Sequence, residues 1–496
     1  MIKKLFLTLL AVVVVIAAVV VVRANRMESH QVATDAGPPA DIQVDADAAA
    51  RRFAGAIRFP TISHEDVEDT DTATFRALQG YFEETYPLVH QQLKKELVSG
   101  LSLLYTWEGR DPDLEPVVLM GHQDVVPVIP GTEEDWEHGP FSGDIADGYV
   151  WGRGSMDDKI SVVSILEAVE ALLAEGFQPR RTIYLAFGHD EEVGGIRGAS
   201  SIARLLEDRG VGPFAFVIDE GGAVVRGMIP GIEGPVALVG IAEKGYVNTE
   251  LLVEGAGGHS STPPDHTNIG ILADAITELE EDQFPASYGG AAASMFEYLA
   301  PEMSFGARAV FANLWLFRPL VTWVMLHNPE TASMVRTTTA VTIIDGGVKA
   351  NVLPISARAI VNHRVLPGET TESVVARDRT TIGDDRVQVL MHGEDHVDPS
   401  PVSDPDSPAF QMLSRTIRQV LAGENVVVAP YLVMGGTDAK YYSGRSKNVY
   451  RFIPATITAD ALKLAHGTNE RMSVEGLVAS IRFFQQLIRN SDSLGS

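Results

Sequence analysis

Short apolar runs alternate with helical patterns over the first half of the chain and again near its end. The strand-like runs lie at 116–121, 182–188, 214–218 and 426–433, and the helical patterns at 160–175, 198–208, 408–421 and 473–489. Strands that alternate with helices in this way are typical of a layered α/β sheet. The sequence therefore predicts an α/β domain, and ligands of such a sheet are expected at the carboxyl ends of its strands.

The pattern changes between residues 243 and 365. There, strand-like runs at 247–253, 337–344 and 357–365 accompany a helical pattern at 268–281. This combination predicts a second, smaller α+β domain that is inserted into the first. The expected organisation is a larger domain made of residues 47–242 and 366–496, with residues 243–365 between its two parts.

An almost unbroken apolar run extends from Leu5 to Val22 and meets Arg23 directly. It is just long enough to span a bilayer and longer than the apolar core of a signal peptide. We therefore expect residues 1–26 to form a single-pass signal anchor that holds the body outside the cytoplasm; cleavage of this segment would make the protein secreted. Residues 27–46 lack apolar periodicity and are expected to form a linker.

Composition excludes one class of partner and one class of metal ligand. The formal net charge of −27, from 39 basic and 66 acidic residues, repels polyanions, so nucleic acid is excluded as a partner. The chain has no cysteine. Disulfides are therefore excluded, and a zinc ion has to be held by histidine and carboxylate side chains.

Five clusters of histidine and acidic residues follow the strand-like runs or lie in glycine-rich loops. They are His122-Gln-Asp124, Gly152-Arg-Gly-Ser-Met-Asp-Asp-Lys159, Asp190-Glu-Glu-Val-Gly194, Val217-Ile-Asp-Glu-Gly221 and Ala465-His-Gly-Thr-Asn469. Each cluster alone is more often a turn, a helix cap or a solvated charge pair. Together they supply the imidazole and carboxylate ligands of two zinc ions, which lie about 3.5–4 Å apart and share a bridging carboxylate.

Each of the five clusters provides one metal ligand in our assignment. We assign His122 and Asp219 to one metal ion, Glu192 and His466 to the other, and Asp157 to the bridging position. Manganese or cobalt ions also fit such ligands, because carboxylate-rich sites discriminate poorly among these metals.

Two further acids remain for catalysis. Asp124 follows His122 by two positions and is expected to accept the second ring proton of that histidine, which fixes its tautomer. Glu191 is expected to take a proton from the attacking water and to deliver it to the leaving amine.

In order and spacing, these clusters resemble the zinc metallopeptidase family that contains carboxypeptidase S, aminoacylase and glutamate carboxypeptidase. In that family the pattern His-x-Asp, Gly-Arg-Gly-x-x-Asp-Asp-Lys, Glu-Glu, Asp and a C-terminal His carries the same roles. The resemblance extends from about residue 47 to the C-terminus, and Ile160, where many relatives have glycine, is a departure that concerns helix packing. It implies a zinc-peptidase-like layered sheet with an inserted α+β lid or dimerisation domain.

The resemblance also points to residues in the inserted domain. Gly257-Gly-His-Ser-Ser-Thr-Pro263 resembles a lid motif whose histidine reaches a neighbouring active site, so His259 is expected to stabilise the oxyanion across a homodimer interface. Arg364 is the candidate for a free α-carboxylate, because its guanidinium offers two parallel donors. The remaining substrate-binding candidates, which resemble family residues lining the cleft, are Asn351, Gly435, Gly436 and Thr437.

Residues 284–335 form an insertion whose segment 309–326 is more apolar than a short connection requires. Three roles are open: packing of the lid core, a tunnel for an acyl chain, or contact with the membrane beside the anchor. Arg318-Pro319 argues against a second spanning helix. Similar insertions accompany the branch that resembles carboxypeptidase S and the secreted N-fatty-acyl amino acid synthase/hydrolase.

These observations predict a membrane-anchored di-zinc hydrolase that cleaves an amide bond to a C-terminal free amino acid. Two substrates fit this chemistry: a short peptide, for a carboxypeptidase of the Gly-Xaa type, and an N-fatty-acyl amino acid, for a hydrolase or synthase. A rival of another class is a catalytically silent, membrane-tethered binding protein. It is disfavoured because neither Glu191 nor any expected metal ligand is missing.

Overall fold

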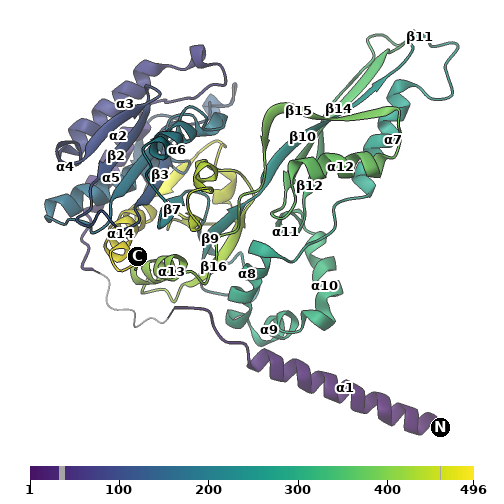
Figure 1. The fold of residues 1–496 in the computed structure, drawn as a ribbon, viewed down its shortest axis with the longest axis horizontal. Coiled ribbons are helices and arrows are strands. Elements are labelled where there is room, and N and C mark those ends of the chain that lie inside the picture. Colours follow the sequence, from purple (N-terminus) through teal and green to yellow (C-terminus); the bar gives the residue numbers. More distant parts are fainter. Residues whose placement is uncertain (33–39, 459, 496) are drawn as a thin grey trace.

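A 10-stranded sheet forms the centre of the larger domain in the computed structural model, which describes residues 1–32, 40–458 and 460–495 (Figure 1). In spatial order its strands are β1 (Lys94–Val98), β2 (Ser102–Trp107), β6 (Ile183–Gly188), β3 (Val117–His122), β7 (Phe216–Asp219), β17 (Val449–Arg451), β9 (Pro235–Glu243), β8 (Ala223–Arg226) and β18 (Thr456–Ile457), while β16 (Val427–Val433) pairs with β9. Strand β3 runs parallel to both β6 and β7. The predicted α/β sheet is confirmed.

Helices cover both faces of this sheet because its central strands are apolar on both sides. Val117 and Leu119 belong to one core cluster and Val118 and Met120 to the other. The helices of the larger domain are α2 (Ala46–Ile57), α3 (Thr72–Thr85), α4 (Pro87–Gln92), α5 (Lys159–Ala174), α6 (Ala199–Asp208), α13 (Pro408–Val420) and α14 (Val474–Ser491). Helix α5 is buried over most of its surface, as its nearly uniform apolar sequence predicts.

The inserted domain is a four-stranded antiparallel sheet with two helices packed on it. The strand order is β12 (Thr338–Gly346), β14 (Ser356–Val365), β10 (Gly245–Glu254) and β15 (Val387–Val397), and the helices are α7 (Asn268–Glu281) and α12 (Thr371–Ile382). Strands β11 (Gly258–His259) and β13 (Val352–Leu353) form its outer tip (Figure 1). The domain extends beyond residue 365, the boundary expected from the sequence, because β15 hydrogen-bonds to β10.

The apolar insertion forms four helices, α8 (Gly290–Leu299), α9 (Phe305–Phe311), α10 (Leu314–Leu326) and α11 (Pro329–Val335). They do not join the core of the lid sheet. Instead, Met295, Tyr298 and Leu299 of α8 belong to the main core of the larger domain, where α8 packs against β16. Of the three roles open from the sequence, packing of the lid core is therefore not the one observed.

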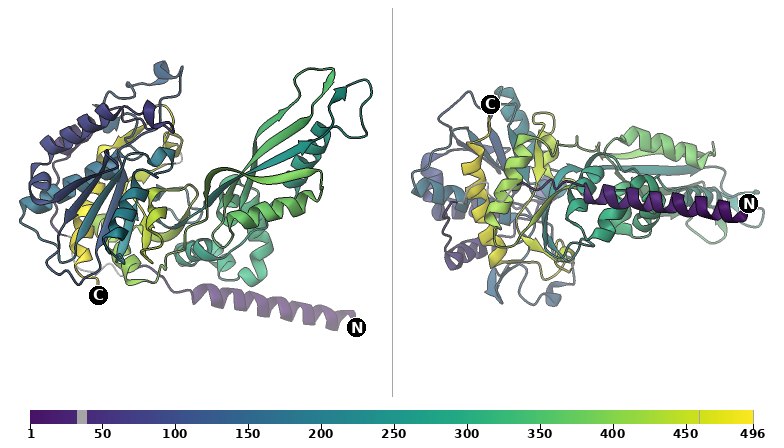
Figure 2. Two further views of the ribbon diagram at one scale, coloured as in Figure 1. Left: turned by 45° about the horizontal axis from the view of Figure 1, so that its top comes forward. Right: turned by 90° about the horizontal axis from the view of Figure 1, so that it is seen from below.

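Helix α1 (Ile2–Asn25) leaves the body beside α9 (Figures 1 and 2). Among the described residues it is the one unbroken helix long and apolar enough to cross a membrane. Part of the expected linker is docked: the Gln31 side chain exchanges hydrogen bonds of 2.8 and 2.9 Å with the backbone of Val428, and His30 stacks on Tyr298. Gly37-Pro-Pro39 lies outside the described residues.

Candidate metal centre

Three neighbouring parallel strands end at one edge of the large sheet, and acidic or histidine side chains follow each of them. His122 is the last residue of β3, Asp219 is the last residue of β7, and Glu191 and Glu192 lie in a short 3-10 helix that follows β6. Because these strands are parallel neighbours, their carboxyl ends meet. The sheet therefore gathers side chains that are far apart in the sequence.

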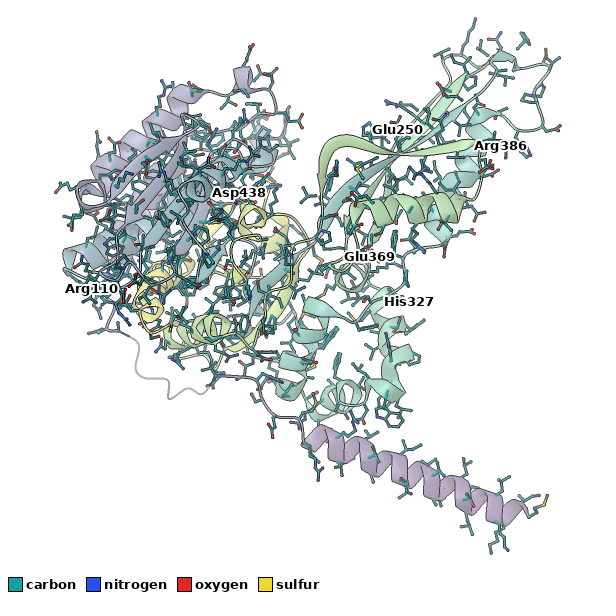
Figure 3. All side chains as sticks on the ribbon, viewed as in Figure 1. Arg110, Glu250, His327, Glu369, Arg386 and Asp438 are labelled. Atoms are coloured by element: carbon teal, nitrogen blue, oxygen red, sulfur yellow. The ribbon has the colours of Figure 1, made fainter. Side chains whose placement is uncertain are left out.

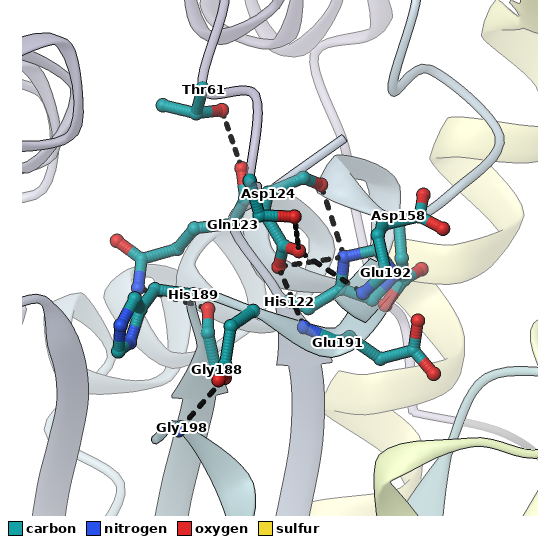
Figure 4. Close-up of polar contacts among 12 residues, drawn as sticks. Thr61, His122, Gln123, Asp124, Asp158, Gly188, His189, Glu191, Glu192 and Gly198 are labelled. Atoms are coloured by element: carbon teal, nitrogen blue, oxygen red, sulfur yellow. Dashed lines mark hydrogen bonds and ion pairs between the residues drawn. The ribbon is translucent and has the colours of Figure 1, made fainter. Parts of the chain in front are cut away.

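Asp124 holds both His122 and the loop of the glutamates. Its Oδ1 lies 3.3 Å from His122 Nδ1, and its two oxygens accept the backbone N–H groups of Glu191 and Glu192 at 3.2 and 3.1 Å (Figure 4). Ser63 Oγ donates to it at 2.7 Å. Although burial opposes the charged form, these donors keep the pKa of Asp124 below its ordinary value. Asp124 is thus placed to leave His122 Nε2 free toward the site.

Asp157 lies between the two histidines. Its Oδ1 is 2.9 Å from His122 Nε2, and its Oδ2 is 3.0 Å from His466 Nε2. Glu192 Oε2 approaches the same His466 nitrogen at 3.2 Å. One carboxylate therefore faces two imidazoles with one oxygen each, which is the arrangement that a bridging ligand between two metal ions requires.

Glu220 enters this group, whereas the carboxylate of Asp219 does not. Glu220 Oε1 lies 3.2 Å from His122 Nε2, and the donor atoms of His122, Glu191 and Glu220 can lie around a common ion. Asp219 Oδ2 instead accepts the backbone N–H of Ala439 at 2.8 Å. Asp219 is the last residue of β7 and Glu220 is the first beyond it, so the contact with His122 comes from the residue after the strand.

Buried carboxylates dominate the electrostatics of the site. Burial, together with repulsion from the acids around them, raises the pKa values of Glu191, Glu220 and Asp438 well above the ordinary range. Three buried carboxylate oxygens have no hydrogen-bond partner among the described residues: both oxygens of Asp438, which is labelled in Figure 3, and Oε1 of Glu192. Unpaired buried carboxylates are costly, so the cluster fits divalent cations that would compensate its charge.

A buried ion pair joins the two loops that carry Asp157 and His466. Arg153 Nη1 lies 2.5 Å from Glu470 Oε2, and its Nη2 donates to the carbonyls of His466 and Gly467. Glu470 Oε1 accepts the backbone N–H of Asp157 at 3.3 Å. The pairing of β5 (Tyr149–Trp151) with β19 (Arg471–Ser473) brings these loops together. Sequence reasoning missed Glu470, because only the fold places it beside Arg153.

Replacing Glu470 by glutamine is expected to weaken metal binding by about 10- to 100-fold, the usual cost of losing a group that orients a ligand. The amide cannot pair with Arg153 as an ion, so both loops lose their common support. Titration of metal-free protein with zinc, followed calorimetrically, measures this change. Glu475→Gln, which alters a first-turn residue of α14 a few positions along, is the matched control. Equal affinity in both variants would contradict the role of the pair.

The residues expected to bind substrate fall into two places. Thr437 is buried, and its N–H and hydroxyl both donate to Glu243 Oε2, while Gly435 and Gly436 beside it are exposed. Arg364 lies at the junction of the two domains with its guanidinium 4.8 Å from the ring centre of Tyr246. Burial and then repulsion from Arg364 lower the pKa of Lys244 in the same junction to about 7. The junction therefore holds the permanent cation of Arg364 beside a lysine whose charged form is disfavoured.

His259 and Asn351 lie elsewhere, at the exposed outer tip of the lid. His259 pairs with Val352, the residue after Asn351, and Ser260 N donates to the carbonyl of Asn351 at 3.2 Å. Figure 1 places this tip at the far end of the lid from the strand ends of the large sheet. Within one chain the structure does not bring these two residues to the metal ligands.

Comparison with known proteins identifies the family. Residues 118–490 match the family described as Peptidase family M20/M25/M40. The chain is 42% identical over 443 residues to the N-fatty-acyl-amino acid synthase/hydrolase PM20D1 of Xenopus tropicalis, covering 88% of this chain and 85% of that protein. It is 40% identical over 446 residues to probable carboxypeptidase S-like 2 of Dictyostelium discoideum, with coverages of 89% and 85%.

A solved structure shows the same fold. The M20 family metallo-carboxypeptidase Sso-CP2 from Sulfolobus solfataricus superposes with a TM-score of 0.64 at 18% identity, covering 90% of this chain and 99% of that one. The resemblance inferred from the five clusters is thereby confirmed. Because the family match covers most of the chain and the relatives align over more than four fifths of their length, the chain belongs to Peptidase family M20/M25/M40 and is an enzyme of that family.

Proposed function

We propose that this protein is a two-metal amidohydrolase that releases a free amino acid from its substrate. The observation that carries the proposal is the position of Asp157, whose two oxygens face one histidine each. Hydrolysis by chelator-stripped and zinc-reloaded protein tests it, because turnover should return only with bound metal.

The proposed ligands form two sets that share Asp157. His122 and Glu220 belong to one set, and Glu192 and His466 to the other. Glu220 replaces Asp219, which was assigned from the sequence. Glu220 lies beside His122, whereas the Asp219 carboxylate accepts a hydrogen bond from the backbone N–H of Ala439. With nitrogen and oxygen donors and no cysteine, the site suits zinc, and it also accepts manganese or cobalt.

The chain's own residues perform the proton transfers. Metal ions held here would polarise the amide carbonyl and make a water molecule more acidic. Glu191 lies beside His122 and Glu220, and it is not the ligand proposed to bridge the two metal ions. It takes a proton from the attacking water and later gives one to the leaving amine. Arg364 holds the α-carboxylate of the amino acid at the domain junction by two parallel hydrogen bonds.

An apolar cavity favours an N-fatty-acyl amino acid over a short peptide. The cavity, of about 670 Å³, lies between the insertion helices and strands β8, β9 and β16. Its wall includes Met434, which precedes the Gly435 loop, and Leu462, four residues before His466. A volume of this size accepts a long hydrocarbon chain, and its wall is almost entirely apolar. One relative is named as an N-fatty-acyl-amino acid synthase/hydrolase and another as a probable carboxypeptidase S-like protein. The two names correspond to the two candidate substrates.

Narrowing this cavity is expected to separate the two substrates. Val321→Trp places a large ring on a buried residue of the wall. Excluding two methylene groups of a long acyl chain costs about 1.6 kcal/mol at ~0.8 kcal/mol each, or roughly a tenfold loss of kcat/KM. Hydrolysis of a glycyl dipeptide should stay unchanged, as should both activities in the control Leu316→Trp on the outer face of α10. Parallel losses for both substrates would contradict an acyl site.

We further propose that two copies of the chain complete one another's sites. His259 lies on the exposed lid tip, and the lid has an open edge strand, β12, with Ile343 and Ile344 exposed. An uncovered apolar edge is suited to pairing with a second chain. His259 of one copy would then steady the developing oxyanion beside the metal ligands of the other.

Mixing two inactive variants tests this arrangement. His259→Ala and Glu191→Gln should each abolish most activity, and heterodimers of the two should regain part of it, because one of their sites combines an intact Glu191 with an intact His259. Activity of the mixture is measured after co-refolding or co-expression, with His266→Ala, an exposed lid-loop histidine, as the control variant. A mixture that stays as inactive as its components would show that His259 does not act across an interface.

A further inference from the structure

Helix α10 has a continuous apolar face that nothing in the described chain covers. Its members repeat at helical spacing, and all are exposed by more than a third: Trp315, Leu316, Pro319, Leu320, Trp323 and Val324. Only the opposite side, with Val321 and Met325, packs into the protein. Packing alone therefore explains one face of α10 and leaves the other unexplained.

The polar groups at the turn before α10 are already satisfied within the protein. Asn313 is fully buried; its Nδ2 donates to the carbonyls of Ala309 and Val20, and its Oδ1 accepts from Trp315 Nε1 at 3.1 Å. The helix itself has no acidic residue. The side chains of Asn313 and Trp315 thus leave no unpaired polar group at this corner, as a segment in contact with hydrocarbon requires.

Helix α1 fixes where this turn lies relative to a membrane. Arg23 Nε, in the last turn of α1, donates to the carbonyl of Ala312 at 3.0 Å, so the corner between α9 and α10 contacts the end of the apolar helix. The two short helices are bent by 106° at this corner. With 13 residues, α10 is about 20 Å long, too short to cross a bilayer. Its C-terminal end is marked by His327 (Figure 3).

We propose that α9 and α10 form a second membrane contact, in which the exposed face of α10 inserts into the lipid leaflet nearest the body without crossing the bilayer. The inference rests on α1 as the membrane anchor and is independent of the proposed reaction. Two tryptophans on this face suit the interfacial region, and Arg318 and Arg23 suit anionic headgroups. The occupant of the face is thus a phospholipid layer.

This contact would give the apolar cavity an opening toward lipid. Leu320 and Val324, exposed by 51% and 54%, belong to the apolar face and also line the cavity, so the cavity and this face meet at α10. A long-chain substrate dissolved in the bilayer can then reach the cavity without passing through water.

The absence of cysteine makes a direct test possible. The full chain carrying Leu316→Cys is labelled with an environment-sensitive fluorophore and reconstituted in vesicles of phosphatidylcholine and phosphatidylserine. Leu97→Cys, on a residue of β1 in the larger domain exposed by 56%, provides the matched control. We expect the label at position 316 to be quenched by a nitroxide-bearing lipid and shielded from aqueous iodide, and the label at 97 to behave in the opposite way.

Two results would overturn the proposal. Iodide quenching at 316 equal to that at 97 would place α10 in water. Shielding from both quenchers would mean that a second copy of the chain, or another protein, covers the face. The unlabelled protein gives an independent measurement: brominated lipid should quench tryptophan fluorescence in the parent chain, and Trp315→Phe with Trp323→Phe should remove that quenching, since the other three tryptophans lie in the larger domain. Because neither readout uses turnover, failure here leaves the proposed reaction untouched.

Discussion

Replacing Asp157 by alanine is expected to abolish both metal binding and hydrolysis. Among the residues that the structure describes, Asp157 is the one side chain whose two oxygens each approach a different histidine, at 2.9 and 3.0 Å. Its removal takes one ligand from each proposed metal set and leaves the remaining carboxylates to repel one another. We expect less than one zinc ion per chain by elemental analysis. We also expect kcat/KM to fall by about 10⁶-fold, which is the lower end of typical enzymatic rate accelerations.

Asp147→Ala provides the control, because Asp147 lies in an exposed turn near the same loop. Circular dichroism of both variants checks that the fold survives. Retention of two metal ions and of substantial activity in Asp157→Ala would show that the two histidines belong to separate, unbridged sites.

Replacing Glu191 by glutamine is expected to have the second largest effect and a different signature. Glutamine keeps the shape of the side chain but cannot accept or donate the proton, so kcat should fall by about 10²- to 10⁴-fold, the usual contribution of general acid–base catalysis. Both metal ions should remain bound, because the proposed sets do not depend on Glu191. Single-turnover kinetics beside metal analysis separates the two effects.

Glu134→Gln provides the control for Glu191→Gln, because it makes the same exchange at an exposed residue. Full activity of Glu191→Gln would refute the assignment of the base, and loss of a metal ion would move Glu191 from proton transfer to metal binding.

The sequence predicted those parts of the site that depend on strand ends. Parallel strands bring their carboxyl ends together whatever the details of packing, so the residues that follow β3, β6 and β7 could be grouped in advance. Asp157 and His466 lie in other loops, and they were assigned from the ligands that two metal ions need. Asp219 was assigned from the sequence, whereas the structure places Glu220 beside His122. Neighbouring acids at the end of a strand differ only in the direction of their side chains, and that direction depends on where β7 ends.

Long-range partners were also beyond reach. Arg153 and Glu470 are separated by most of the chain, and neither lies in a pattern that predicts the other. The apolar insertion was recognised from composition, but its packing against β16 depends on how the chain returns from the lid. Likewise, the strand β15 carries the lid beyond residue 365 because its partner β10 lies far earlier in the sequence.

The most direct test of the two-metal proposal measures metal content and turnover on the same sample of the full chain. The protein is stripped with a chelator, reloaded with zinc in steps, and assayed with a long-chain N-acyl amino acid and with a glycyl dipeptide. We predict that amino acid release returns with zinc, saturates at two ions per chain, and is faster from the long-chain substrate. Hydrolysis that persists in fully stripped protein, or saturation at a single ion, would contradict the account.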